Sequence, residues 1–194
     1  PAGIIWPRET LQKLAEFCHR KGIIVISDEI HCDMALFGNK HIPFASVSPE
    51  AAACSITFGS PSKTFNIAGI VSSYAIVPNK DLRERFFGWL EASELNAAPL
   101  FSPIATIAAF KHGEEWRRQM IEYVEGNIEF IEEYCRKYMP QIRPVRPQAS
   151  FLVWLDCTGL DMLHDELIDL FVNKAGLALN DGEMFNPGGK GFMR

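Results

Sequence analysis

The chain has 194 residues, 47% of them hydrophobic, so it can bury a substantial core and form one domain or two smaller ones. Its formal net charge of −5 argues against nucleic acid as the main partner, because no basic stripe is available to contact phosphates. No apolar run approaches the roughly 20 residues that a membrane span needs. The five cysteines are scattered without a Cys-x-x-Cys spacing, which favours a reduced, cytoplasmic setting and argues against structural zinc.

The first half of the chain alternates helical and strand patterns. Apolar residues at helical spacing predict a helix over residues 8–21, and Gly22 follows as its expected C-cap. Three runs rich in β-branched and apolar residues predict strands, the first two of them buried: residues 23–27, 55–58 and 74–77. Glycine and prolines among mixed residues predict a long surface loop over 34–53.

The second half is mostly helical in pattern. Four segments have helical periodicity: residues 81–95, a short helix around 104–108, 114–138 and 162–175. Three further segments are expected to be strands: residues 151–155, 177–179 and the start of another at 191–193. We therefore predict an α/β chain, with a parallel-sheet domain to about residue 120, a bridging helix and a small α+β domain.

Two polar residues follow the first two predicted strands. Asp28 comes directly after the first strand, and Lys63 lies in the loop after the second. Parallel sheets place ligands at the carboxyl ends of their strands, so we expect both side chains at one edge. A lysine amine can form a Schiff base with a carbonyl, and a buried carboxylate at Asp28 would keep a cationic ring nitrogen protonated. The pair therefore predicts a cofactor site.

The same residues admit other interpretations. Lys63 could simply be solvated, Asp28 could cap the next turn, and a lone histidine such as His31 is commonly a structural hydrogen bonder. The run Ser60–Lys63 matches the Ser-x-x-Lys pattern of penicillin-recognising enzymes, but neither Ser-Asp-Asn nor Lys-Thr-Gly follows it. Asp28, His31 and Asp33 do not have a recognised metal-ligand spacing, so no metal site is predicted.

Two motifs together carry a family resemblance. The run Ser27–His31, combined with Ser60–Gly69, resembles the fold-type I pyridoxal-phosphate enzymes of the class I/II aminotransferase superfamily. Asp-Glu-Ile-His followed by Cys-Asp, and Ser-Lys-Thr-Phe-Asn-Ile-Ala, are most similar to its cystathionine β-lyase (C–S β-lyase) branch, as are Pro147–Asp156 and Gly191–Arg194. The resemblance implies the C-terminal part of an aspartate aminotransferase-like large domain over residues 1–120, with a mostly parallel sheet. Residues 121–194 would form an incomplete small domain.

The resemblance also implies a role for each candidate residue around pyridoxal 5′-phosphate. Lys63 would form the Schiff base and then shuttle the substrate α-proton. Asp28 would pair with the pyridinium nitrogen, and His31 stands where many relatives have a tyrosine that hydrogen-bonds the phenolic oxygen. Ser60 would bind the cofactor phosphate, with help from Ser62.

Other positions bear on how the substrate is bound and on whether the chain is a whole protein. Arg194 matches the arginine that grips the substrate α-carboxylate through a bidentate pair. Val71 stands where many aminotransferases carry a phosphate-binding arginine, which fits the lyase branch. The chain opens at Pro1 without a methionine, and the family's preceding half of the large domain is missing, so we expect a piece of a longer protein that lacks activity by itself.

The implied function is β-elimination from cystathionine or a related cysteine S-conjugate, giving a thiol, pyruvate and ammonia. The partners would be a small amino-acid substrate and a second copy of the protein in a cytoplasmic homodimer, with no nucleic acid and no membrane. An aminotransferase using the same Lys63 and Asp28 is the first alternative. A regulatory or binding protein that keeps the fold and the cofactor site is the second, because fold does not fix function.

Overall fold

The computed structural model describes residues 3–194, which divide into two compact units. Among the described residues, one unit comprises residues 5–121, and the other comprises residues 122–194 together with residues 3 and 4. The boundary falls within helix α5 (Glu114–Tyr138). Within residues 3–194, no helix has the length and apolarity needed to span a membrane.

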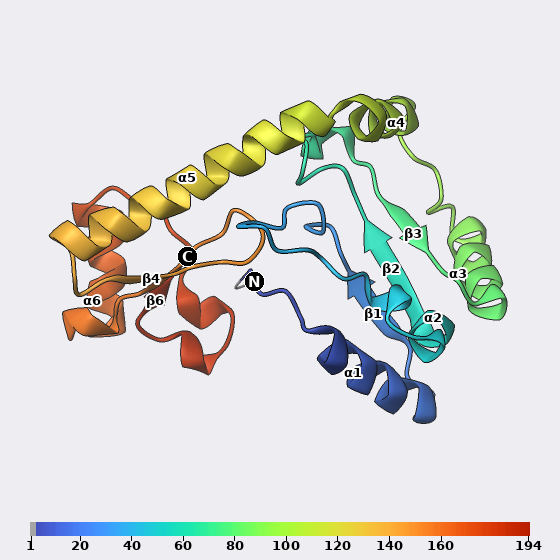
Figure 1. The fold of residues 1–194 in the computed structure, drawn as a ribbon, viewed down its shortest axis with the longest axis horizontal. Coiled ribbons are helices and arrows are strands. Elements are labelled where there is room, and N and C mark those ends of the chain that lie inside the picture. Colours follow the sequence, from blue (N-terminus) through green and yellow to red (C-terminus); the bar gives the residue numbers. More distant parts are fainter. Residues whose placement is uncertain (1–2) are drawn as a thin grey trace. The chain divides into compact units, whose positions relative to one another are not determined.

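Within residues 5–121, three strands form a sheet in the order β1-β2-β3 (Figure 1). Strand β1 (Val25–Asp28) runs parallel to β2 (Ser55–Gly59), so that Asp28 pairs with Phe58. Strand β3 (Tyr74–Ile76) runs antiparallel to β2 on the other side. The helices of this unit are α1 (Arg8–Arg20), α2 (Pro49–Cys54), α3 (Lys80–Ala92), α4 (Ser102–His112) and the first turns of α5.

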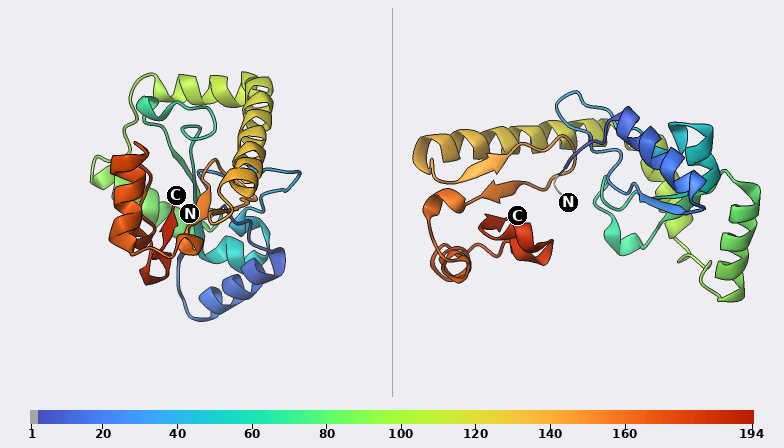
Figure 2. Two further views of the ribbon diagram at one scale, coloured as in Figure 1. Left: turned by 90° about the vertical axis from the view of Figure 1, so that its left-hand side faces the viewer. Right: turned by 90° about the horizontal axis from the view of Figure 1, so that it is seen from below.

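Helix α1 packs against α2 and the segment between β1 and β2, as both views of Figure 2 show. The shared core consists of Leu11, Ala15, Phe44, Val47 and Ala51, with Val25 and Ile42 partly buried against it. Helix α1 ends as its sequence predicts: Gly22 has φ +65°, the left-handed conformation that favours glycine after a helix. This core holds β1 and the segment that follows it in place.

The expectation of a long surface loop over residues 34–53 is wrong. The segment contains a 3₁₀ turn at Phe44–Ser46 and helix α2, and Met34 and Leu36 are almost completely buried. Pro49 begins a helix instead of interrupting one, because the N-cap Ser48 accepts the Ala51 N–H at 3.2 Å. Several apolar residues that lie among the glycine and prolines of this segment are buried, so the segment is part of the core.

The expected burial of the first strand is also wrong. The strand begins only at Val25, and the side chain of Ile26 is 68% exposed. Among the described strands β1 has β2 as its one neighbour, and the face that carries Ile26 is largely uncovered. Strand β2 is buried along most of its length, as predicted.

Within residues 122–194, strands β4 (Arg143–Val145), β5 (Trp154–Asp156) and β6 (Phe192–Met193) form an antiparallel sheet. Helix α6 (His164–Asp169) continues into a π-helical turn over Leu170–Lys174. The core joins the C-terminal part of α5 to this sheet and to α6, and consists of Cys135, Ile142, Cys157, Leu167, Phe171 and Met193.

Helix α5 has the bounds that periodicity predicts, but two strand predictions in this unit need correction. Residues 177–179 are not a strand, because the Leu177 N–H donates to the Phe171 carbonyl and closes the end of the preceding helix. Strand β4 is not predicted from the sequence, since Pro140, Pro144 and Pro147 indicate a break there. Pro144 is tolerated there because β4 lies at the edge of the sheet.

Candidate active site

The carboxyl ends of β1 and β2 bring the predicted site residues of residues 5–121 to one sheet edge. Asp28 is the last residue of β1, and β2 ends at Gly59, after which the chain turns through Lys63. The Glu29 N–H donates to the Phe58 carbonyl at 2.9 Å, so the parallel ladder continues one residue past β1. The two loops therefore leave the sheet side by side.

Lys63 is exposed, and within residues 3–194 its amine has no hydrogen-bond or ion-pair partner. The two residues after it anchor the turn. Thr64 is completely buried, and the Phe65 ring packs at 5.6 Å from the Phe110 ring and 6.0 Å from the Trp116 ring. The backbone at Lys63 is thus held firmly while its four-carbon side chain can still change rotamer.

Ser60 and Ser62 form a hydroxyl pair just before Lys63. The Ser60 Oγ lies 2.5 Å from the Ser72 carbonyl, 2.8 Å from the Ser62 Oγ and 3.0 Å from the Ser62 nitrogen. A hydroxyl has one proton, so Ser60 donates to Ser72 and accepts from Ser62. The Ser72 hydroxyl in turn lies 2.6 Å from the Thr106 Oγ1 on α4. Ser60 is therefore fixed by the fold, and the Ser62 hydroxyl is the more adaptable of the two.

Asp28 is exposed, which corrects the expectation of a buried carboxylate at this position. Its Oδ1 accepts the Ile30 N–H at 3.3 Å and starts the turn that carries His31. The buried carboxylate is that of Glu29, because successive side chains of a strand point to opposite faces. His31 is partly buried in this turn, and its carbonyl accepts the Met34 N–H at 3.1 Å.

The Glu29 carboxylate is bound by three donors that sequence analysis did not identify. Its Oε1 accepts the Ser27 hydroxyl and the Phe44 N–H, each at 2.9 Å, and its Oε2 lies 2.6 Å from the His41 Nε2. Burial opposes ionisation, but the hydrogen bonds from His41, Phe44 and Ser27 outweigh it and lower the pKa of Glu29. His41 lies 12 residues along the chain, so no local pattern indicates this pairing.

The first turns of α5 contact both loops of the site. The Arg117 Nη1 donates to the Asp33 carbonyl at 3.0 Å in the loop after β1, while the neighbouring Trp116 packs on Phe65 after β2. Arg117 is itself oriented by hydrogen bonds of 2.7 and 2.9 Å to the Glu114 carboxylate. Sequence analysis missed this arginine, since nothing in a solvent-facing helix pattern distinguishes it from other charged residues.

Tyr74 lies against the end of β2. The place of a Cβ on Gly59 is 2.5 Å from the Tyr74 Oη and 2.6 Å from its Cε2, so the phenol ring packs directly on the Gly59 backbone. Burial first, and then the nearby Cys32 and Asp33, raise the pKa of Tyr74. The ring therefore stays neutral beside the acidic loop that follows β1.

Arg194 belongs to the other unit. Its backbone N–H and carbonyl each bond to Asn180 at 2.9 Å, and its Nη2 donates to the Asn180 Oδ1 at 3.2 Å. The guanidinium carbon lies 4.3 Å from the centre of the Phe185 ring, and the Nε is buried without a partner among the described residues. A stacked guanidinium with an unused N–H donor is suited to binding a carboxylate.

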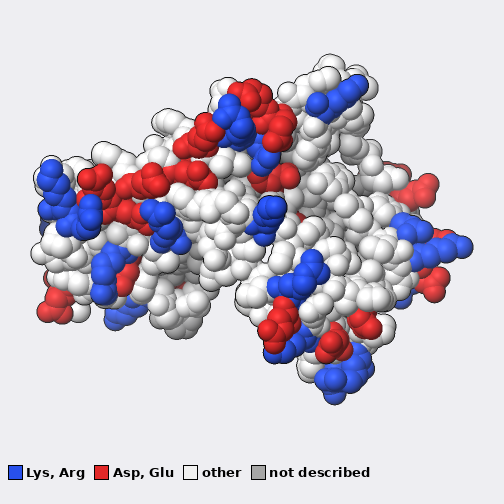
Figure 3. All heavy atoms as spheres, in the orientation of Figure 1, with Lys and Arg blue, Asp and Glu red and all other residues white. Residues whose placement is uncertain are grey.

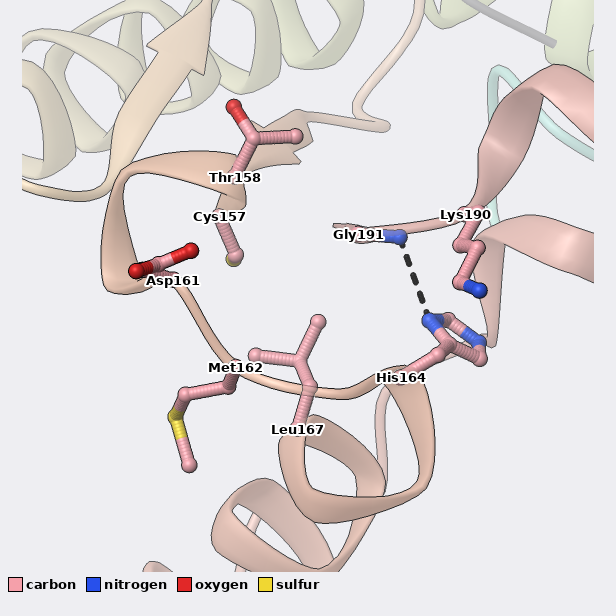
Figure 4. Close-up of a pocket in the computed structure, with 8 residues that line it drawn as sticks. All are labelled: Cys157, Thr158, Asp161, Met162, His164, Leu167, Lys190 and Gly191. Atoms are coloured by element: carbon pink, nitrogen blue, oxygen red, sulfur yellow. Dashed lines mark hydrogen bonds between the residues drawn. The ribbon is translucent and has the colours of Figure 1, made fainter.

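Residues 122–194 also form an open pocket of about 160 Å³ between the β5–α6 connection and the loop before β6 (Figure 4). His164 lines it and is almost buried. The Gly191 N–H donates to the His164 Nδ1 at 3.1 Å, so the ring proton is on Nε2, which donates to Asp181 at 2.8 Å. Both ring nitrogens are thus used in holding the two ends of the 181–191 loop.

The surface is mixed in charge. On the face shown in Figure 3, the Lys and Arg side chains of the described residues are interspersed with Asp and Glu, and acidic side chains gather along α5. Among residues 3–194, no three His, Cys, Asp or Glu side chains lie together as potential metal ligands. The sheet edge around Asp28 and Lys63 instead presents an amine, a carboxylate, an imidazole and two hydroxyls. That set suits a ligand with a carbonyl, a basic ring nitrogen and a phosphate.

Comparison with known proteins identifies the family. The model for "Aminotransferase class I and II" matches residues 1–194. Cystathionine beta-lyase PatB of Bacillus subtilis (strain 168) is 40% identical over 194 residues, which are 100% of this chain and 50% of that protein. Cystalysin from Treponema denticola, a structure containing pyridoxal 5′-phosphate, aligns with a TM-score of 0.93 and 31% identity over 99% of this chain and 49% of its own. A PLP-bound protein from Clostridium difficile 630 aligns with a TM-score of 0.94 and 37% identity over 100% of this chain and 50% of its own.

The chain therefore spans about half the length of the relatives that it matches. The structural neighbours have the fold of pyridoxal-phosphate-dependent aminotransferases, which confirms the predicted fold class and the resemblance stated from the motifs. The name of PatB, cystathionine beta-lyase, matches the branch of the family that the two motifs resemble. The chain belongs to the aminotransferase class I and II family.

Proposed function

We propose that the intact protein is a pyridoxal-phosphate-dependent C–S β-lyase acting on cystathionine or a related cysteine S-conjugate. One observation carries the proposal: an unpartnered lysine amine at Lys63 and an exposed carboxylate at Asp28 occupy the same carboxyl edge of a parallel strand pair. The 40% identity to a protein named cystathionine beta-lyase supports the choice of reaction within the family.

The residues present fit the cofactor. Lys63 would hold it through its amine, and Asp28 would hold the ring nitrogen protonated from the opposite loop. His31 would donate to the phenolic oxygen, while Ser62, with Ser60 behind it, would donate to the phosphate. Pyridoxal phosphate, when bound, supplies an electron sink for the electron pair left at the substrate Cα.

The proton chemistry belongs to Lys63. Once the substrate amine has taken its place on the cofactor, the released Lys63 amine would take the Cα proton. The electron pair left at Cα would form the Cα–Cβ double bond as the Cβ–S bond breaks with its pair going to sulfur, and the thiolate would leave. The Lys63 ammonium can return a proton to the departing sulfur. Water then hydrolyses the remaining three-carbon enamine to pyruvate and ammonia, so the reaction consumes one water and needs no second keto acid.

The remaining assignments complete this proposal. Residues 1–120 would be the C-terminal part of the cofactor-binding large domain, and residues 121–194 would belong to the small domain. Arg194 would bind the substrate α-carboxylate, supported by its stacking on Phe185 and its unpartnered Nε. We propose that the intact protein is a cytoplasmic homodimer with a small amino acid as substrate, and sedimentation of the intact protein tests the dimer.

The first experiment tests the lysine. The intact protein is mixed with pyridoxal phosphate, reduced with borohydride and digested, and the peptides are mapped by mass spectrometry. We expect a visible absorbance band before reduction and the reduced cofactor attached to Lys63 afterwards. The variant Lys63→Ala should lose both, whereas Lys111→Ala, which removes an exposed lysine of α4, should keep them. Absence of the band and the adduct in the wild type would remove the cofactor and the mechanism.

A product assay separates the lyase from the aminotransferase. Pyruvate and free thiol should accumulate from cystathionine when no keto acid is added. Turnover that requires a keto-acid acceptor and yields a new amino acid would instead assign transamination to the same Lys63 and Asp28. Both assays use the intact protein, since this chain covers about half of its relatives.

A further inference from the structure

The carboxylate of Glu29 has no part in the proton chemistry, yet it is the most heavily hydrogen-bonded acid of the site. Its residue is 8% exposed, and its two oxygens accept from a hydroxyl, a backbone N–H and an imidazole. Removing a carboxylate from water costs free energy unless donors replace the water, so three donors on one buried carboxylate mark a fixed arrangement.

Glu29 is also fixed through its backbone. Its N–H donates to the Phe58 carbonyl of β2 at 2.9 Å, and its carbonyl accepts the Cys32 N–H at 2.9 Å. The first bond fastens Glu29 to the strand that leads to Lys63. The second closes the turn that contains His31. Every polar group of Glu29 is therefore bound, within a four-residue stretch that also supplies Asp28.

The donors on the side chain come from a different part of the unit. His41 and Phe44 belong to the segment between β1 and α2, which is itself held by the core beneath α1. The contact between Glu29 and His41 thus connects the end of β1 to a segment that the core holds in place. Without it, the Glu29 carboxylate would keep its bonds from Ser27 and Phe44, both on Oε1, and its Oε2 would lose the bond from His41.

We propose that Glu29 and His41 form a positioning pair, which fixes the Asp28–His31 turn so that both side chains meet the cofactor. The inference rests on the proposed function, because it assigns Asp28 and His31 to the cofactor ring. Glu29 and His41 touch neither cofactor nor substrate in this scheme. They act through the backbone on the residues that do.

The test compares cofactor affinity in variants of the intact protein, titrated as the cofactor-free form with pyridoxal phosphate and followed by the visible band. His41→Ala removes the donor to Glu29 and should weaken binding about tenfold, the lower end of the effect of outer-shell partners at metal sites. His41→Gln places an amide N–H near the position of Nε2 and should restore most of the affinity. His19→Ala, at an exposed histidine of α1, is the matched control and should bind like the wild type.

Two further measurements separate positioning from a general loss of stability. Urea unfolding of each cofactor-free variant is compared with its affinity, and the wavelength of the visible band reports the contact of Asp28 with the ring. Weaker binding with a shifted band in His41→Ala, rescued by His41→Gln, supports the proposal. Unchanged affinity and an unchanged band, with only a lower unfolding free energy, would overturn it.

A replacement variant is needed where His41→Ala fails to fold, and failure of the proposal must be separable from failure of the proposed function. If His41→Ala does not fold, Ser27→Ala, which removes one donor from the Glu29 Oε1, takes its place with an intermediate loss of affinity expected. The proposal is overturned if Ser27→Ala folds and binds pyridoxal phosphate with wild-type affinity, and the double variant His41→Gln/Glu29→Gln does so as well. A wild type that forms no borohydride-stable adduct at Lys63 refutes the proposed function instead, so the two failures are distinguishable.

Discussion

Asp28 pairs with Phe58 in the parallel register of β1 and β2, and the bond from the Glu29 N–H to the Phe58 carbonyl locks that register at 2.9 Å. Because side-chain direction alternates along a strand, this register turns Asp28 outward and Glu29 inward at the level where β2 leads to Lys63. Shifting β1 by one residue would exchange the two carboxylates. The identity of the exposed acid therefore depends on strand pairing as much as on sequence.

The approach of Tyr74 to Gly59 gives the first prediction. We expect Gly59→Ala to lower the unfolding free energy by about 1–3 kcal/mol, because the new methyl group meets the phenol ring and forces it to move. In a Tyr74→Ala background the same change should cost much less, which a double-mutant cycle from urea unfolding measures. Gly88→Ala is the control, since nothing lies within 4 Å of that Cβ and alanine favours the α3 helix. Equal costs of Gly59→Ala in both backgrounds would contradict the packing.

Local patterns predicted the elements whose own residues determine them. The apolar stripe of residues 114–138 gave helix α5 with the observed bounds, and Gly22 marked the end of α1. The rule that parallel strands share a carboxyl edge was sufficient to expect Asp28 and Lys63 in adjacent loops. In each case the signal lies within one helix or one strand and its flanking residues.

Features that depend on a distant partner could not be predicted in this way. The exposure of Asp28 follows from the register with β2, and the burial of Glu29 follows from donors at His41 and Phe44. Pro144 indicated a break, yet it forms a strand because its position opposite Leu155 is at a sheet edge. These outcomes are set by tertiary pairing, for which composition and spacing within a single segment carry no information.

The buried thiol of Cys157 and the partly buried thiol of Cys32 lead to a second prediction, about chemical reactivity. Burial first, and then the nearby Asp156 and Cys135, raise the pKa of Cys157 to about 12, and burial with Asp33 and Glu29 raises that of Cys32 to about 11. The thiolate is the reactive form, so at about pH 8 fewer than roughly one in a thousand of these thiols is reactive. We expect iodoacetamide to leave both unmodified in the native intact protein and to modify them after urea denaturation, measured by peptide mapping. Rapid native labelling of Cys157 would contradict this burial.

The hydrogen bonds to Glu29 give a third prediction, on acid stability. They lower its pKa below the ordinary value of 4.5, although burial acts in the opposite direction. A carboxylate with a lowered folded-state pKa contributes stability that is fully present above its unfolded value and is lost as pH falls through the folded value. The difference in unfolding free energy between the wild type and Glu29→Gln should therefore be constant just above about pH 5 and shrink progressively below about pH 4.5.

Urea unfolding at a series of pH values measures this difference. Glu9→Gln provides the control, because Glu9 pairs with Lys13 at the exposed surface of α1 and its substitution should change acid stability little. A wild-type advantage over Glu29→Gln that grows on acidification would mean that the hydrogen bonds do not stabilise the ionised form.

The fourth prediction concerns His164, whose two ring nitrogens hold the ends of the loop before β6. His164→Ala removes the acceptor for the Gly191 N–H and the donor to Asp181, and should lower the unfolding free energy by about 2–3 kcal/mol. His164→Asn keeps an acceptor near Nδ1, and His164→Gln keeps a donor near Nε2, so each should recover part of that loss. Urea unfolding of the intact protein measures all three, with His112→Ala at the exposed end of α4 as control.

The same variants report on Arg194 during turnover. Asp181 pairs with Met193 next to Arg194, so a loosened loop should disturb the guanidinium that we assign to the substrate carboxylate. We expect His164→Ala to raise KM several-fold while kcat changes less, because the proton chemistry at Lys63 does not involve His164. A fall in kcat at unchanged KM would contradict this expectation. It would show that His164 does not affect substrate binding and only holds this loop.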